Sequence, residues 1–171
     1  MRMYLKLVLC LLVGACTMPD ADGEPALGQT VAEVSAITGF SLRETSSSSC
    51  LGITGNNGKL ETRLDDCNPA NDNQRWEFNG GFLRHSVTGL CLDIPSSSLA
   101  DGTRVQLFPC NGGANQDFRL YPVLESAGSV VSHWFLVVKH SGKCIVKGGF
   151  PLGAVQGPCN ITVQSSWYLV S

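Results

Sequence analysis

The chain has 171 residues, only 15% of them charged, and a formal net charge of −2 at pH 7. It contains no run of lysine or arginine that could follow a phosphate backbone, which argues against nucleic acid as a partner. Its 19 glycines and 8 cysteines are typical of an exported β protein with short strands and many turns.

The first fifteen residues, MRMYLKLVLCLLVGA, indicate a secretory signal peptide. Basic Arg2 and Lys6 precede an apolar run that is too short to span a bilayer, and small residues follow. The sequence VGAC at 13–16 resembles the bacterial lipobox, in which the cysteine is acylated and becomes the first mature residue. This resemblance implies a lipidated Cys16 and a place in the bacterial cell envelope, as an outer-membrane or surface lipoprotein. Ordinary signal cleavage, which would leave Cys16 as a free thiol, is the alternative.

Residues 16–35 are predicted to form a flexible tether. The segment contains two prolines, two glycines and four acidic residues, and it shows no apolar periodicity. A chain of about 20 such residues has a root-mean-square reach of roughly 25 Å, enough to hold a domain clear of a lipid surface. A propeptide that is trimmed away is the other interpretation.

From about residue 37 onward the same pattern is written three times. Each copy has a cysteine at the end of a short apolar run, a second cysteine 15 to 19 residues later, and an aromatic 8 or 9 residues further on. The copies are Cys50, Cys67 and Trp76; Cys91, Cys110 and Phe118; Cys144, Cys159 and Trp167. The repeats cover about 37–80, 81–122 and 123–171. Three units suit a small pseudo-threefold barrel.

These six cysteines predict a disulfide framework, because an even number of cysteines in an exported chain is typical of one. Fifteen pairings are possible in principle. The repeat symmetry selects one bond within each unit: Cys50–Cys67, Cys91–Cys110 and Cys144–Cys159. Each bond would close a loop that stabilises the fold by about 3 kcal/mol in the chain-entropy model.

Each unit contains four short apolar segments separated by turns, which predicts twelve strands in one all-β domain over 36–171. The dipeptides Leu42-Arg43, Leu83-Arg84 and Val138-Lys139 align as the first strands of the three units. A closed or nearly closed sheet removes exposed strand edges. The additional residues between Val123 and Trp134 are predicted to form a longer hairpin or a surface loop.

The ends of the first two repeats carry a family resemblance. Asn73-Gln74-Arg75-Trp76 and Asn115-Gln116-Asp117-Phe118 resemble the Q-x-W motif of the ricin B-chain type lectins. The segment from Cys91 to Phe118 resembles a complete sugar-binding repeat of that family, and the similarity covers about 37–171. It implies a β-trefoil: a short six-stranded barrel capped by three hairpins. The residues that the resemblance makes core anchors are Trp76, Phe118 and Trp167.

The resemblance also implies one competent sugar site, in the second repeat. Asp93 would accept hydrogen bonds from two adjacent ring hydroxyls, and Phe108 would stack on the apolar face of the sugar. Asn115 would add a bond to one hydroxyl, and Gln116 would orient the carboxylate of Asp93 from behind. Phe108 stands where the family more often has tryptophan, which reduces the stacking area.

The other two repeats lack these groups. The first has Gly52 at the carboxylate position and Asp65 at the aromatic position, and the third has Val146 and Gly157 there. In the third repeat Gln164 is also one residue out of register. A single site predicts monovalent binding of roughly 4 to 6 kcal/mol, in the millimolar to high micromolar range. Many copies on a surface would then supply avidity.

The sequence predicts a non-catalytic carbohydrate-binding lectin with no cofactor and no metal. It carries no H-E-x-x-H, G-x-S-x-G or phosphate-loop motif, and no carboxylate pair suggests a glycosidase. Galactose-type glycans are the favoured ligands, since they are the commonest in the family.

Two other functions stay open. The first is a delivery subunit similar to the lectin-like subunits of cytolethal distending toxins, which would hold a nuclease partner. The second is a trefoil with only a structural or protein-binding role. A domain that targets a separate hydrolase to its substrate is a variant of the lectin interpretation.

Overall fold

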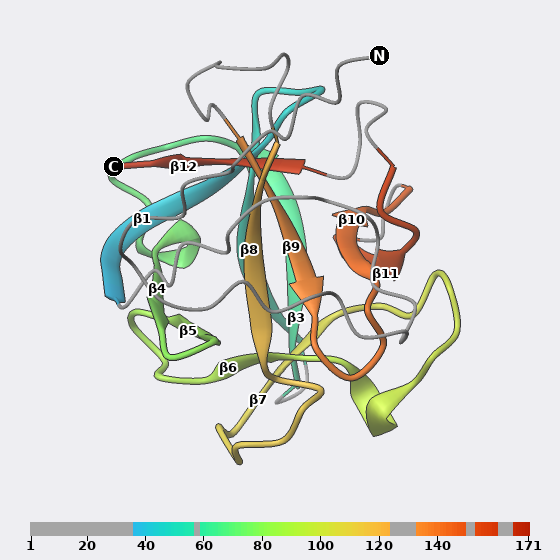
Figure 1. Ribbon diagram of the computed structural model, residues 1–171. Coiled ribbons are helices and arrows are strands. Elements are labelled where there is room, and N and C mark those ends of the chain that lie inside the picture. Colours follow the sequence, from blue (N-terminus) through green and yellow to red (C-terminus); the bar gives the residue numbers. More distant parts are fainter. Residues whose placement is uncertain (1–35, 57–58, 124–132, 150–152, 161–165) are drawn as a thin grey trace, which may run out of the picture.

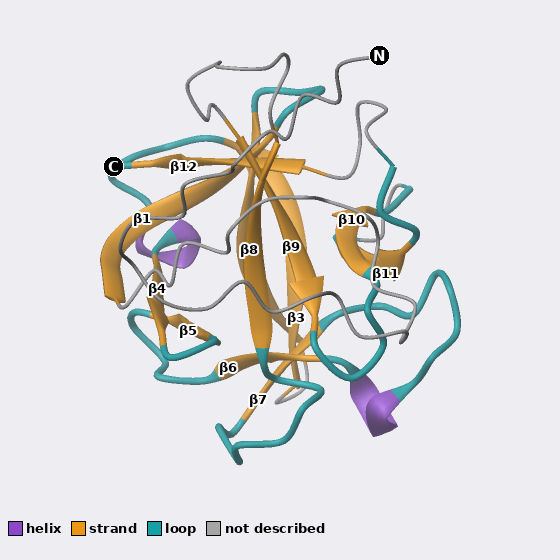
Figure 2. Ribbon diagram, in the orientation of Figure 1, coloured by secondary structure: helices purple, strands orange, loops and turns teal. Residues whose placement is uncertain are grey.

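The computed structural model describes residues 36–56, 59–123, 133–149, 153–160 and 166–171 (Figure 1). Strands dominate these residues, and two short 3-10 helices accompany them (Figure 2). The elements in chain order are β1 (Ala36–Glu44), β2 (Ser49–Asn56), β3 (Lys59–Asp66), η1 (Asp72–Gln74), β4 (Trp76–Asn79), β5 (Phe82–His85), β6 (Cys91–Asp93), η2 (Pro95–Ser97), β7 (Gln106–Phe108), β8 (Phe118–Val123), β9 (His133–Val138), β10 (Cys144–Lys147), β11 (Ala154–Gly157) and β12 (Ser166–Val170). The all-β prediction is confirmed.

Several predictions concern residues outside the described ranges. The signal peptide at 1–15, the lipidation of Cys16 and the tether at 16–35 all lie there, as does Gln164. Among the described residues, no helix has both the length and the apolar character needed to cross a membrane. The segment predicted between Val123 and Trp134 is described only at its ends, where Val123 pairs with His133 across the antiparallel β8–β9 pair.

The strands form one antiparallel sheet that folds back on itself. Its strand order is β11-β10-β9-β12-β1-β2-β3-β7-β6-β5-β4, with β8 paired to β9. An additional pairing of β1 with β4 brings the β4 end of this order back to β1, which closes a ring of the seven strands β1-β2-β3-β7-β6-β5-β4. Strand β1 also pairs with β12, so the first and last described strands lie side by side, as Figure 1 shows in blue and red.

The three repeats hold their cysteines in the same register. Cys50 on β2 faces Asp65 on β3, Cys91 on β6 faces Phe108 on β7, and Cys144 on β10 faces Gly157 on β11. The corresponding hairpins are therefore β2–β3, β6–β7 and β10–β11, and positions can be compared between repeats one residue at a time.

One alignment made from the sequence was wrong. The aromatic that ends one repeat pairs with a residue six positions before a first cysteine: Trp167 with Glu44, Trp76 with His85, and Phe118 with Val138. Val138 therefore corresponds to Glu44 and His85, not to Leu42 and Leu83. The residue equivalent to those two leucines is Leu136, two positions earlier and fully buried.

The three repeat-ending aromatics lie in the core. Trp76, Phe118 and Trp167 are all buried. The indole nitrogens of Trp76 and Trp167 each donate a hydrogen bond, 2.8 Å long, to the carbonyls of Leu51 and Ile145 respectively. The two tryptophans thus tie β4 to β2 and β12 to β10, whereas the side chain of Phe118 has no N–H with which to do the same.

The three predicted disulfides form. Cys50 is bonded to Cys67, Cys91 to Cys110, and Cys144 to Cys159, with sequence separations of 17, 19 and 15 residues. In each repeat the bond ties the loop that follows one hairpin strand back to the start of the other. Such a tie limits how far the loop can move from the hairpin.

Candidate functional site

The four residues predicted for the second repeat come from three neighbouring segments. Asp93 ends β6, Phe108 ends the adjacent antiparallel strand β7, and Asn115 and Gln116 lie in the loop that leads to β8. In the β6–β7 register, Asp93 stands directly opposite Gln106. These positions bring Asp93, Asn115 and Gln116 into hydrogen-bond contact.

The carboxylate of Asp93 is the centre of this group. Its side chain is only 3% exposed. Gln106 Nε2 donates to Oδ1 at 2.8 Å, while Asn115 Nδ2 and Gln116 Nε2 donate to Oδ2 at 2.7 and 3.1 Å. An ionised carboxylate offers about four acceptor sites, so about one remains for a further donor. The sequence predicted bonds to two hydroxyls, and this arrangement leaves room for one unless an amide turns away.

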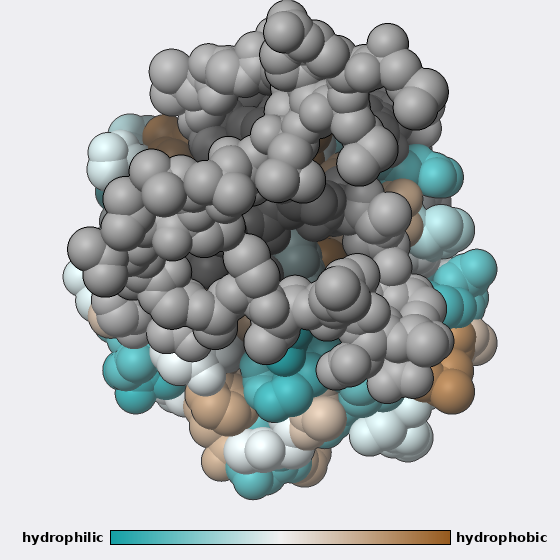
Figure 3. Space-filling view, in the orientation of Figure 1, coloured by the Kyte–Doolittle hydropathy of each residue, from teal (hydrophilic) through white to brown (hydrophobic). Residues whose placement is uncertain are grey.

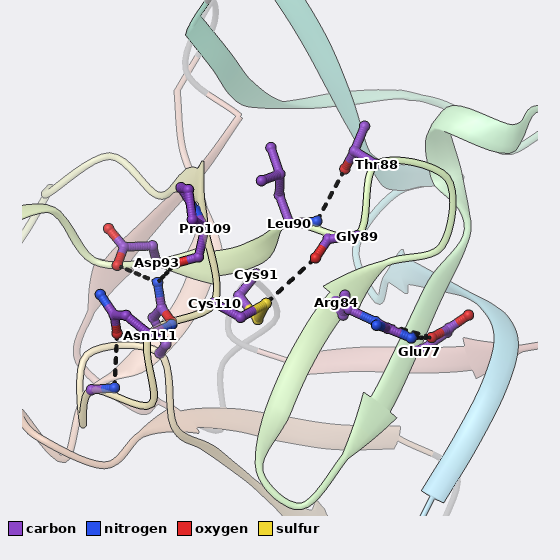
Figure 4. Close-up of a disulfide and its surroundings, with 12 residues drawn as sticks. Glu77, Arg84, Thr88, Gly89, Leu90, Cys91, Asp93, Pro109, Cys110 and Asn111 are labelled. Atoms are coloured by element: carbon purple, nitrogen blue, oxygen red, sulfur yellow. Dashed lines mark hydrogen bonds and ion pairs between the residues drawn. A yellow bond between two sulfur atoms is a disulfide. The ribbon is translucent and has the colours of Figure 1, made fainter.

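Gln116 holds Asp93 in place from the buried side of the site. It is fully buried, and besides donating to Asp93 its Nε2 donates to the carbonyl of Pro109 at 3.1 Å, while its Oε1 accepts from the amide of Asn111 at 2.8 Å. Figure 4 shows Asp93, Pro109 and Asn111 gathered beside the Cys91–Cys110 disulfide. The glutamine therefore fixes the carboxylate and the loop after the second cysteine together.

The first repeat contains the same support without the carboxylate. Gln74 Oε1 accepts from the amide of Asn68 at 2.9 Å, and its Nε2 donates to the carbonyl of Asp66 at 2.9 Å. The glutamine of the Q-x-W motif thus organises its loop in both repeats. Only Gln116 also meets an aspartate, so a structural role and a role in the site coexist in that residue.

Gln106 belongs to the same group and was missed from the sequence. Because side chains alternate along a strand, Gln106 and Phe108 share one face of β7, and Gln106 faces Asp93 across the hairpin. That period of two, counted back from Phe108, was the signal that could have identified it. Among the described residues, the side-chain oxygens of Gln106 and Asn115 accept no hydrogen bond, so both remain available as acceptors.

Phe108 supplies an apolar surface beside these acceptors. Its side chain is 47% exposed. The other large apolar side chains exposed in the described part of the chain are Val87, Leu99 and Val170. Apolar residues are scattered among polar ones over the visible coloured surface in Figure 3. A half-exposed ring next to fixed acceptors suits a ligand with one C–H face and several hydroxyl donors.

Comparison with known proteins identifies the fold family. Residues 38–147, more than half of the chain, match the family described as the ricin-type beta-trefoil lectin domain. The chain belongs to the ricin-type β-trefoil lectin family.

Solved structures agree with this lectin-type trefoil. The designed threefold-symmetric protein ThreeFoil is 24% identical with a TM-score of 0.65, covering 77% of this chain and 97% of its own. A Polyporus squamosus lectin, solved with a human-type influenza-binding epitope, is 15% identical with a TM-score of 0.63, covering 79% of this chain and 48% of its own. At these identities the likeness establishes the fold alone.

A short match also occurs to a mouse protein. Over 36 residues the chain is 44% identical to polypeptide N-acetylgalactosaminyltransferase 16 of Mus musculus. The match covers 21% of this lectin-type chain and 6% of the mouse protein. The chain thus spans only a small part of that relative's length.

The first repeat of this lectin-type trefoil lacks the group found around Asp93. Gly52, at the position of Asp93, faces Arg63, and Arg63 Nε forms an ion pair with Asp65 at 2.7 Å. A Cβ atom on Gly52 would lie 3.1 Å from both the carbonyl oxygen of Asn73 and Cγ of Gln74. An exposed ion pair therefore takes the place of the aromatic surface, and the backbone leaves little space for a carboxylate.

The third repeat is apolar at the equivalent positions. Val146 faces Val155, and a Cβ atom on Gly157 would lie 3.2 Å from a methyl carbon of Val146. Neither of its two strands, β10 and β11, contains a carboxylate or an aromatic. In the described residues, no cluster of three or more histidine, cysteine, aspartate or glutamate side chains is arranged to hold a metal ion.

Proposed function

We propose that this lectin-type trefoil is a non-catalytic carbohydrate-binding protein with one sugar site, in its second repeat. The observation that supports this most strongly is the carboxylate of Asp93, held by three amides next to the half-exposed ring of Phe108. Amide donors that hold a buried carboxylate orient it before a ligand arrives.

The chemistry of the site favours a sugar with a hydroxyl that donates to Asp93. Further hydroxyls would donate to the side-chain oxygens of Asn115 and Gln106, while the apolar face of the ring stacks on Phe108. Galactose-type sugars remain the favoured ligands. Because Phe108 offers less area than tryptophan and one site acts alone, we expect a monovalent dissociation constant in roughly the millimolar to high micromolar range.

The setting that we propose is the cell surface. Three disulfides and a lectin-type domain are consistent with an exported protein. Lipidation of Cys16, followed by the 16–35 tether, would display many copies of the 36–171 domain on the bacterial envelope. Display of many weak sites raises the effective affinity for a polysaccharide or a glycoprotein without any new contact.

The test is a glycan array probed with the oxidised protein in multivalent form. We expect the wild-type protein to bind one coherent class of glycans, with galactose-terminated glycans favoured. Asp93→Asn should abolish this binding, because the new amide places a donor where a hydroxyl must donate. Phe108→Ala should weaken binding of the free sugar about tenfold, the equivalent of about 1.4 kcal/mol.

Asp65→Ala is the matched control for Phe108→Ala. Asp65 occupies the position of Phe108 in the first repeat, and both are surface residues on the second strand of their hairpins. We expect Asp65→Ala to leave binding unchanged and both variants to melt close to the wild-type temperature. A blank array from folded wild-type protein, or equal binding by Phe108→Ala, would contradict the proposal and favour a protein-binding trefoil.

A further inference from the structure

The loop at 95–104 joins the two halves of the proposed site. It leaves β6 immediately after Asp93 and Ile94 and re-enters the sheet just before Gln106. At its start, the amide of Ile94 donates to the carbonyl of Asn115, and Asn115 Nδ2 donates to the carbonyl of Ile94, both at 3.1 Å. Any displacement of this loop therefore acts on Asp93, Asn115 and Gln106 together.

The loop contains a pair of strained residues. Ser96 and Ser97 have φ angles of 55° and 49°, in the left-handed region that favours glycine. For residues other than glycine this conformation is energetically unfavourable. Such a backbone persists only where the surrounding structure holds it, and strained residues of this kind concentrate beside ligand sites.

The contacts that hold the loop come from β11 of the third repeat. Nε2 of Gln156 donates to the carbonyls of Ser98 and Ala100 at 3.0 and 3.1 Å. The main chain of Gln156 accepts from the amide of Gly102 and donates to the carbonyl of Thr103, both at 2.8 Å. Ser141 Oγ donates to Oε1 of Gln156 at 2.7 Å and so fixes the orientation of the side-chain amide.

The residue type at position 156 is unusual for its place in the fold. Gln156 pairs with Ile145, as Leu64 pairs with Leu51 and Leu107 with Leu92 in the other two repeats. The third repeat thus has a fully buried glutamine where the others have leucine. A buried amide is costly unless it is hydrogen-bonded, and the bonds of this one go to the loop of the second repeat.

Two further side chains of the third repeat reach the same loop. Lys143 Nζ donates to the carbonyl of Leu99 and forms an ion pair with Asp101 Oδ1, both at 2.6 Å. His140 Nε2 lies 3.0 Å from the carbonyl of Ser98 and donates to it. In Figure 1 the yellow loop runs along the same side of the molecule as the orange β10–β11 hairpin.

We propose that Gln156 and Lys143 are positioning residues for the sugar site of the second repeat. The third repeat, which has no site group of its own, holds the 95–104 loop in its strained form and thereby sets the affinity and selectivity of the neighbouring site. This inference rests on the proposed function, since it concerns the same site.

The test compares Gln156→Met with the wild-type full-length oxidised protein. Methionine has nearly the length of glutamine but forms none of its hydrogen bonds. The carbonyls of Ser98 and Ala100 keep His140 and the hydroxyl of Thr103 as partners. The hydroxyl of Ser141 loses its acceptor, but Ser141 is only partly buried and can bond to water instead, so the fold should persist. We expect faster hydrogen exchange at the amides of Ala100 and Gly102, about fivefold to tenfold weaker binding of the best array glycan, and a changed ranking of glycans.

Matched variants separate positioning from general destabilisation. Leu64→Met introduces methionine at the equivalent position of the first repeat, away from the loop, without removing a side-chain hydrogen bond. Lys139→Gln removes an ion pair with Asp117, 2.7 Å long, as Lys143→Gln removes the one with Asp101. Only Gln156→Met and Lys143→Gln should alter the ranking of glycans. A loss of global stability would instead lower the affinity for every glycan by the same factor.

The outcomes are distinct. A wild-type protein that binds no glycan overturns the proposed function and this inference with it. A wild-type protein that binds, together with a Gln156→Met variant of unchanged affinity and ranking, overturns this inference alone. Loop amides whose exchange is unaffected by Gln156→Met also overturn it.

Discussion

At the scale of single residues, His85 is the clearest titrating group of the fold. It is fully buried at the end of β5. Its ring is edge-on to that of Trp76, with 5.3 Å between the two ring centroids. Nδ1 accepts from the amide of Thr88 at 3.3 Å, which places the hydrogen of the neutral ring on Nε2. Burial lowers the pKa of His85 below its ordinary 6.5, while backbone groups of Asn73 and Asp72 and the charge of Asp72 act in the opposite direction.

This lowered pKa predicts a loss of stability on acidification. Between the folded pKa and the unfolded value of 6.5, the unfolded chain binds a proton that the folded chain does not. The contribution of His85 to the free energy of unfolding therefore rises with pH in that window and is constant above 6.5. Acidification below 6.5 lowers the stability of the protein. Urea unfolding of the wild-type protein at several pH values between 5 and 7.5 measures the slope.

His85→Gln is the comparison, because its side-chain oxygen can still accept from Thr88 but does not titrate. The difference in unfolding free energy between the two proteins should shift in favour of the variant as the pH falls from 7 to 5. Parallel curves over this range would mean that His85 does not carry the effect.

The sequence could bring residues together where the repeat fixes their spacing, but not where only a contact between strands or repeats decides. Asp93, Asn115 and Gln116 lie at fixed spacing from the cysteines and the terminal aromatic, and in the structure their side chains are hydrogen-bonded to one another through Asp93; their role in sugar binding stays a prediction. Gln106 was missed because its contact with Asp93 depends on the pairing of β6 with β7. The spacing of residues within one strand does not reveal which residues face each other across two strands. Gln156 was missed for the same reason, since its partners belong to another repeat.

At the scale of elements, the turn between β1 and β2 is organised by a buried acid. Glu44 is fully buried, and it accepts from the amide of Ser46 and from the hydroxyls of Ser46 and Ser47, each at 2.8 Å. Lys147 Nζ lies 3.8 Å from the same carboxylate. The serines that follow Glu44 thus form a turn whose hydroxyls compensate for the loss of water around one buried carboxylate.

Removing both hydroxyls should destabilise this turn. We expect the double variant Ser46→Ala/Ser47→Ala to lower the free energy of unfolding by about 2 kcal/mol, because hydrogen bonds to charged groups stabilise more than neutral ones and water replaces them only in part. Denaturant unfolding at pH 7 provides the measurement. The control is Ser48→Ala, because Ser48 lies in the same turn but is exposed and has no side-chain hydrogen bond to a described residue. An equal loss of unfolding free energy in that variant would show that the bonds to Glu44 are not the cause.

The strands of the three repeats could be located from the sequence, but their register could not always be matched. Strand positions could be predicted because apolar segments recur between turns of glycine, serine and asparagine. The match of Val138 to Leu42 and Leu83 failed because all of β9 from Phe135 to Val138 is buried, so the hydrophobic pattern there does not distinguish one register from another. The pairing of Phe118 with Val138 resolved it.

At the scale of the whole molecule, the threefold repeat does not imply three binding sites. The backbone is shared, yet Gly52 and Val146 stand where the second repeat has Asp93, and the first and third hairpins present an ion pair and a glycine in place of Phe108. All three repeats keep the buried aromatic and the disulfide, and neither depends on a carboxylate or an aromatic at the site positions. Binding residues can therefore be lost from a repeat without loss of the fold.

We expect one sugar per chain. In an NMR titration of the isotopically labelled, oxidised protein with the free sugar that the array identifies, amides between Cys91 and Gln116 should shift along a single binding curve. Amides beside Gly52 and Val146 should stay in place. Gly52→Asp should not add a second site, because its Cβ atom would press against the carbonyl of Asn73 and against Gln74. A second independent curve in the first or third hairpin would show that those repeats bind sugar by other groups, and it would remove the argument that the third repeat serves the second.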